Sequence, residues 1–165
     1  MPSNALRSAL LVRAPEAERL ADGPSSLITL FADSNDTHEA LTANRATLQA
    51  GSPGAPAHFH TLAAEVLFVL GGSMMVLAGE EVHTLEEGDF FLVPPRVPHA
   101  FAPAPGRDAD ALVLFTPGLP RFDYYRLLER VAQGVATVQE IRDSSERYDN
   151  HYVDSPVWRK TLAAR

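Results

Sequence analysis

The sequence predicts an all-β sandwich or barrel, and three observations favour that fold class. Residues 25–116 divide into short apolar or alternating segments of strand length. Turn residues separate these segments regularly, and the 165-residue chain contains 13 prolines and 10 glycines. No helical pattern of useful length lies between the segments, which argues against a parallel α/β sheet.

The strands are expected in order along the middle of the chain. Their segments are 25–33, 40–50, 58–60, 65–70, 73–78, 80–85, 89–94, 97–102 and 110–116. In this interpretation Gly71 and Gly72 separate two strands. Short strands at this spacing are typical of sandwiches and small barrels.

After Pro117 the pattern changes to helical spacing. Residues 121–134 carry apolar side chains at helical intervals and end at a glycine. A second helix is expected over 137–149, with Thr137 as N-cap and Glu140 at the capping-box position. The chain therefore divides into an N-terminal extension that packs on the barrel (1–24), the barrel (25–117), and a C-terminal helical segment and tail (118–165).

Composition excludes several classes of protein. The formal net charge of −7 argues against a nucleic-acid partner and against binding to anionic membranes, since both need clustered positive charge. The absence of cysteine excludes disulfides, thiolate metal sites and a cysteine nucleophile. No segment has the length of a signal sequence core or of a membrane span, so we expect a cytoplasmic protein.

A group of histidines marks the candidate site. His58 and His60 are two residues apart and share one face of an extended segment. Four residues, 61–64, separate His60 from Glu65, and a hairpin loop of that length would place Glu65 opposite His60. His99 begins a later strand. Three imidazoles and one carboxylate suit one divalent transition metal per chain, namely Fe, Mn, Co, Ni, Cu or Zn.

These residues resemble the two motifs of the cupin superfamily. The first motif is matched by His58, His60, Glu65 and Gly72, and the second by Gly88, Pro94 and His99. The resemblance implies a double-stranded β-helix, a jelly-roll-like barrel, with the metal inside and one or two C-terminal helices. Three positions depart from the usual pattern. Arg96 stands where a glycine is usual, Pro103 where an asparagine is usual, and Gly51 and Gly54 straddle the place of the leading glycine.

The resemblance extends to the quercetin dioxygenase-like single-domain cupins. It implies a dioxygenase that acts, with O₂, on a phenolic, flavonol-like or enol substrate, with Glu65 as metal ligand and catalytic base. Alternation places apolar side chains on the inner wall as a substrate pocket, at Leu67, Val69, Val97 and Phe101. Two alternatives remain open: a non-redox isomerase or polyketide cyclase, and a non-catalytic cupin that binds small molecules.

The remaining histidines and the outer face complete the expectations. We expect His83 to be solvated and His38 to lie in a polar loop, and a role for His151 over the barrel mouth stays open. With Glu65 facing inward, Val66, Phe68 and Leu70 would face outward and form an exposed apolar patch. The resemblance and this patch together predict a homodimer.

Overall fold

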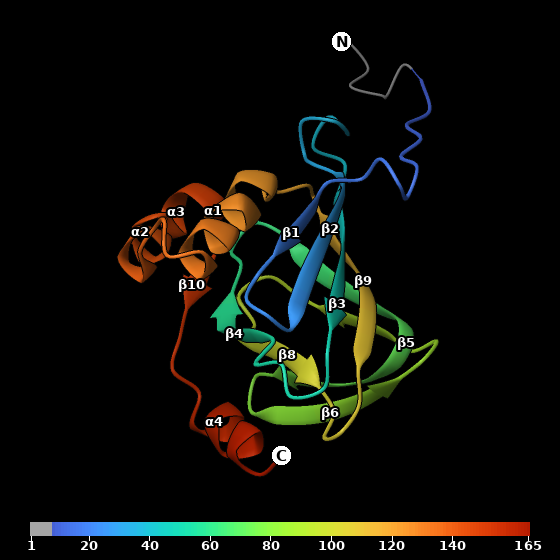
Figure 1. Ribbon diagram of the computed structural model, residues 1–165. Coiled ribbons are helices and arrows are strands. Elements are labelled where there is room, and N and C mark those ends of the chain that lie inside the picture. Colours follow the sequence, from blue (N-terminus) through green and yellow to red (C-terminus); the bar gives the residue numbers. More distant parts are fainter. Residues whose placement is uncertain (1–7) are drawn as a thin grey trace.

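A curled antiparallel sheet of ten strands dominates residues 8–165, the part of the chain that the computed structural model describes (Figure 1). The sheet order is β1-β2-β3-β9-β5-β8-β4-β10, and β6 and β7 both pair with β5. The strands are β1 Arg19–Ala21, β2 Ser26–Ala32, β3 Thr42–Leu48, β4 Ala55–Phe59, β5 Ala64–Ala78, β6 Glu81–Glu86, β7 Phe90–Val93, β8 His99–Pro103, β9 Ala109–Thr116 and β10 His151–Tyr152. The expected all-β barrel architecture is confirmed.

One long strand connects the two walls of the barrel. The first half of β5 pairs with β7 and β9, and its second half pairs with β6 and β8. The expected break at Gly71 and Gly72 is wrong, because β5 continues through both glycines and only its register with β9 shifts. Gly72 has a φ of +73°, and a Cβ at that position would collide with the Asp108 carbonyl. The two glycines therefore allow a bend within one strand.

The expected hairpin between the histidine strand and Glu65 is also wrong. β4 pairs with β8 and β10, and its pairings in the described residues do not include β5. The segment between β4 and β5 instead crosses from one wall of the barrel to the other. Ala63 within this crossing is buried, which ties the crossing to the core.

Alternation along β5 sorts its side chains between core and surface. Leu67 and Val69 are fully buried, whereas Phe68 and Leu70 are 37% and 41% exposed. Val66 lies on the outer face, as expected, in register with the exposed Leu92, but it is itself only 7% exposed. Its place in register opposite Leu92 of β7 and Leu114 of β9 explains this burial.

The homodimer stays a prediction, and the exposed apolar face supplies its test. Phe90 and Leu92 of β7 are 63% and 48% exposed beside Phe68. If a second copy covers this face, the protein has twice the mass of one chain at micromolar concentration. Phe90→Glu should then give a monomer in size-exclusion chromatography with light scattering. A monomeric wild type would contradict the prediction.

Helices cover one end and one side of the barrel. They are α1 Phe122–Ala132, α2 Val138–Asp143, α3 Ser145–Tyr148 and α4 Pro156–Ala163. In Figure 1, α1, α2 and α3 form one group beside β10, and α4 lies apart from them near the C-terminus. Trp158 of α4 packs with buried alanines of β4 and β8.

The C-terminal segment holds more helical elements than the one or two expected. The expected second helix is divided into α2 and α3 at Ser144, and α4 had no sequence prediction. The capping box is confirmed, since the Thr137 hydroxyl accepts from the Glu140 amide and the Glu140 carboxylate accepts from the Thr137 amide. The three-part division of the chain stays a prediction. None of the described helices is both long and apolar enough to cross a membrane.

The arginine in place of the usual motif glycine gives a stability prediction. Arg96 is exposed and has a φ of 69°, a left-handed conformation that favours glycine. Its amide donates to the His60 carbonyl at 2.6 Å, so the local structure requires this conformation. We expect Arg96→Gly to raise the free energy of unfolding by about 0.5–1 kcal/mol, because relief of strain exceeds the added chain entropy.

Chemical denaturation measures this effect, and Arg96→Ala is the matched control. Alanine removes the same side chain but retains the left-handed strain, so it should not stabilise the protein. Equal effects of glycine and alanine would show that backbone strain at Arg96 is not the cause.

Candidate metal centre

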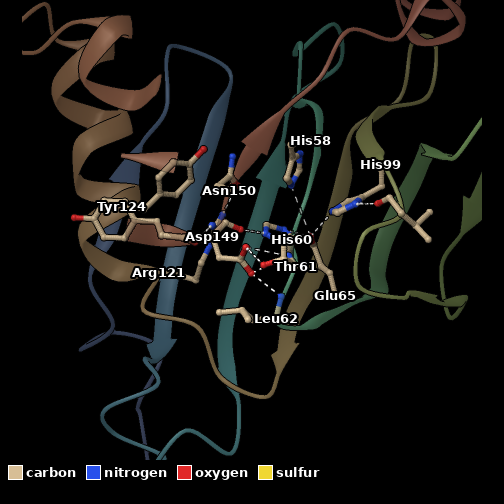
Figure 2. Close-up of polar contacts among 12 residues, drawn as sticks. His58, His60, Thr61, Leu62, Glu65, His99, Arg121, Tyr124, Asp149 and Asn150 are labelled. Atoms are coloured by element: carbon tan, nitrogen blue, oxygen red, sulfur yellow. Dashed lines mark hydrogen bonds and ion pairs between the residues drawn. The ribbon is translucent and has the colours of Figure 1, made fainter. Parts of the chain in front are cut away.

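Four buried side chains converge inside the barrel: His58, His60, Glu65 and His99 (Figure 2). Each is at most 5% exposed. One potential ligand atom from each residue lies within 4.8 Å of the other three. The structure thus brings together the whole set that the sequence pattern selected.

Strand register and the crossing segment explain how these residues meet. His58 of β4 and His99 of β8 lie directly opposite each other in the antiparallel pair. His60 directly follows β4. Glu65 is the second residue of β5 and pairs in register with Val93 of β7 and Phe115 of β9. The carboxylate therefore approaches the histidines from the other wall of the barrel, not from a hairpin partner.

Backbone carbonyl groups orient all three imidazoles. The Nδ1 atoms of His58, His60 and His99 lie 2.7, 2.6 and 2.9 Å from the carbonyl oxygens of Pro56, Asp149 and Val97 respectively. Nδ1–H donates in each case, so in the neutral ring Nε2 carries the free lone pair. This arrangement typically accompanies metal-ligating histidines.

The three Nε2 atoms face one carboxylate oxygen. Oε2 of Glu65 lies 2.6 Å from Nε2 of His99, 3.0 Å from that of His60 and 3.9 Å from that of His58. Three nitrogen donors and one oxygen donor, buried and held at this separation, fit a divalent transition metal. They do not suit Mg²⁺ or Ca²⁺, which prefer sites made mostly of oxygen.

Charge at the cluster is concentrated on Glu65 and His99. Burial alone would raise the pKa of Glu65, but the charge of His99 and the hydrogen bond from its Nε2 hold that pKa well below its usual range. Burial opposes a charge on His99, yet the Glu65 carboxylate outweighs it and raises the pKa of His99. Burial lowers the pKa of His60, and it lowers that of His58 further because the other imidazoles add to the effect. His58 and His60 are therefore neutral at pH 7.

This distribution predicts that metal binding releases a proton. A raised folded-state pKa means that protonated His99 contributes stability below its unfolded pKa, and that this contribution is lost as pH rises through the folded pKa. A metal needs the same Nε2 lone pair and must displace that proton. Below the folded pKa of His99 we expect about one proton released per metal, and metal affinity falling about tenfold per pH unit of acidification.

Calorimetric metal titrations in two buffers of different ionisation enthalpy count the protons released. Metal binding at pH 6 without release of a proton would contradict this assignment of charge to His99.

Asp149 supports the site from the C-terminal segment, and the sequence reasoning did not identify this role. Its carbonyl accepts from His60, and its carboxylate accepts from the amides of Thr61 and Leu62 at 2.8–2.9 Å. Asp149 has a φ of 49° and ends α3. The sequence could have indicated a helix end at this aspartate. Its contact with His60 spans 89 residues, so no local pattern could indicate it.

The other histidines lie outside the cluster. Nε2 of His151 lies 3.0 Å from the Asp149 carboxylate, and its ring stacks on Phe59. The side chain of His83 is 43% exposed, near Glu81 on the β5–β6 hairpin. His38 lies between β2 and β3 with a φ of 51°.

A cavity of about 650 Å³ opens onto the cluster through His58 and Glu65. Of the four expected pocket residues, Phe101 lines this cavity. Leu67 and Val69 are fully enclosed in the core, and they and Val97 are not among the described residues that line it. The sequence reasoning missed several polar and aromatic lining residues from β3 and the C-terminal segment, namely Asn44, Arg121, Tyr124, Tyr125, Asn150 and Tyr152.

One family model matches the part of the chain that contains the cluster. Residues 44–116 match the family model described as "Cupin domain", and this range contains all four residues of the cluster. No curated protein matches the chain in sequence.

Several solved structures share the fold. KdgF from Halomonas sp. is 21% identical with a TM-score of 0.56, over 67% of this chain and 94% of that chain. An RmlC-like cupin from Shewanella frigidimarina is 20% identical with a TM-score of 0.55, over 71% and 96% of the two chains. A predicted oxalate decarboxylase from Thermotoga maritima is 18% identical with a TM-score of 0.58, over 65% and 98%. At these identities the likeness concerns the fold.

Proposed function

We propose that this chain, of which residues 44–116 match the cupin domain model, is a metal-dependent enzyme, a dioxygenase acting on a phenolic, flavonol-like or enol substrate. The observation that carries the proposal is the position of Glu65. It belongs to the four-residue cluster and also lines the cavity, as does His58, whereas His60 and His99 are not among the described residues that line it. A ligand in the cavity would meet a carboxylate and the metal position together.

The four clustered residues would hold one divalent transition metal through three Nε2 atoms and one carboxylate oxygen. Bound there, such a metal polarises a substrate oxygen and, if redox-active, supports chemistry with O₂. The protein supplies the orientation of the ligands, through the three carbonyl groups that accept from Nδ1.

Glu65 would handle the substrate proton. The charge of His99 and the hydrogen bond from its Nε2 outweigh burial and hold the pKa of Glu65 well below the usual range, so the group is an ionised acceptor. An enol or phenol hydroxyl in the cavity could transfer its proton to this carboxylate. The neighbouring cavity wall contains Phe101, Val113 and Phe115, which limit the access of water to that proton.

A non-redox reaction, isomerisation or cyclisation, is the second candidate, and Arg121 favours it. This guanidinium lines the same cavity as Glu65. A base and a fixed positive charge in one cavity can form and stabilise an enolate without O₂.

Oxygen uptake distinguishes the candidates. Protein reconstituted separately with Fe²⁺, Ni²⁺, Mn²⁺, Co²⁺, Cu²⁺ and Zn²⁺ is mixed with quercetin and simpler enols, and both oxygen and substrate are followed. The proposal predicts stoichiometric oxygen consumption with at least one redox-active metal. Substrate conversion without oxygen uptake would favour the isomerase or cyclase, and tight binding without conversion would favour a binding protein.

A further inference from the structure

Three buried side-chain nitrogens in residues 8–165 have no hydrogen-bond partner within the protein. They are Nε of Arg121, Nδ2 of Asn150 and Nε1 of Trp158. All three are N–H donors, and all three residues line the cavity that reaches Glu65. Buried donors are normally satisfied, so these three nitrogens are exceptions in the wall of the cavity. An oxygen-rich ligand would supply acceptors for them.

Arg121 is the charged residue among these three. It is 3% exposed and forms no ion pair with an acidic side chain of the described residues. Its Nη1 donates to the Tyr148 carbonyl at 3.4 Å, and its Nη2 donates to Oδ1 of Asn150 at 3.1 Å. The rings of Tyr124 and Phe115 lie 4.3 and 4.9 Å from the guanidinium carbon. These rings contact the faces of the cation and leave its Nε edge without an acceptor.

Asn150 supplies a second unpartnered donor beside Arg121. It is 2% exposed, and its Oδ1 already accepts from Arg121. That bond orients the amide and leaves Nδ2 as a second free donor. Figure 2 shows Arg121 and Asn150 beside each other, next to His60 and Asp149. The pair offers donors and a positive charge, the combination that binds a planar carboxylate.

The acidic groups of the cavity wall leave this charge available. Glu65 faces the three imidazoles. Asp154 is paired with Arg159. Asp22 also lines the cavity, but it forms no ion pair with Arg121.

We propose that Arg121 and Asn150 form a carboxylate-binding subsite, and that the ligand of this cavity is a small, largely apolar organic acid. The inference rests on the proposed function, because it identifies the substrate class for the same site. The carboxylate contacts Nε of Arg121 and Nδ2 of Asn150, and the other end of the molecule presents its oxygen to His58 and Glu65. The cavity volume of about 650 Å³ suits an aromatic or enol acid of this kind.

The test uses benzoate and its neutral counterpart benzamide as probes. Calorimetric titration of chelator-treated protein should show benzoate binding about 10-fold to 100-fold more tightly than benzamide, the range expected for hydrogen bonds to a charged group. Arg121→Met should remove this preference. Arg142→Gln is the matched control, because Arg142 also lines the cavity but is exposed, and it should retain the preference.

A second variant keeps the proposal testable if Arg121→Met fails to fold. Asn150→Asp places a carboxylate beside the guanidinium and fills the subsite from within. We expect unchanged or higher thermal stability together with loss of the benzoate preference. If Arg121 has only a structural role, the wild type will bind benzoate no more tightly than benzamide. That result would overturn the proposal. Retained preference in Asn150→Asp would also overturn it.

These titrations are independent of the proposed reaction, since they use metal-free protein and no turnover. If benzoate is preferred but no metal binds and no substrate reacts, the reaction is wrong and the subsite stands. If metal binds and neutral flavonols react but benzoate is not preferred, only the subsite is wrong.

Discussion

Replacing His99 with alanine is expected to abolish stoichiometric metal binding. Nε2 of His99 lies 2.6 Å from Oε2 of Glu65 and completes the set of three nitrogen donors. Its loss removes one ligand and leaves the buried Glu65 carboxylate with less compensating charge. Since mutation of groups that merely orient metal ligands costs 10-fold to 100-fold in affinity, we expect a loss of at least about 100-fold. Competition with a chelator of known affinity measures it.

His83→Ala is the matched control. His83 is an imidazole on an outer hairpin, near Glu81 and away from the cluster. The variant should bind metal as the wild type does. Equal losses of affinity in both variants, with both folded by circular dichroism, would mean that the metal site is wrongly assigned.

Replacing Glu65 with glutamine is expected to lower turnover about 10²-fold to 10⁴-fold, the usual contribution of a general base. Glutamine retains the shape of the side chain but cannot accept the substrate proton at neutral pH. Because Glu65 also belongs to the metal cluster, the rate must be expressed per bound metal atom. Single-turnover kinetics with reconstituted protein separates the proton-transfer step from metal occupancy.

Glu81→Gln serves as the control for this variant, because the Glu81 side chain is 82% exposed on the β5–β6 hairpin. Its rate per metal should equal that of the wild type. A Glu65→Gln rate within about threefold of the wild type would exclude Glu65 as the base, since general bases contribute far more than this.

The four clustered residues could be predicted from the sequence because each lies in or beside a strand with local alternation. The route to Glu65 was nevertheless wrong. A hairpin was expected between β4 and β5, but Glu65 faces His60 from the other wall of the barrel. Two strands were expected where β5 is continuous, because a Gly-Gly pair is compatible with both a turn and a bend. Local patterns do not distinguish these outcomes.

The polar half of the cavity could not be predicted, and the reason is physical. Arg121, Asp149 and Asn150 reach the site from the C-terminal segment, through contacts that span tens of residues. Their neighbours in sequence indicate only helix ends. Leu67 and Val69 lie on the inner face of β5, as alternation predicts, but their side chains fill the core and do not line the cavity. Alternation identifies the inner face of a strand but not where that face leaves a cavity.

Counting metal atoms per chain in protein purified without chelator tests the central claim most directly. Elemental analysis should find close to one divalent transition metal per chain, lost in His99→Ala and retained in His83→Ala. If the purified protein holds no metal and takes none up on reconstitution, the clustered His58, His60, Glu65 and His99 do not form a metal centre, and the proposed enzyme chemistry is wrong.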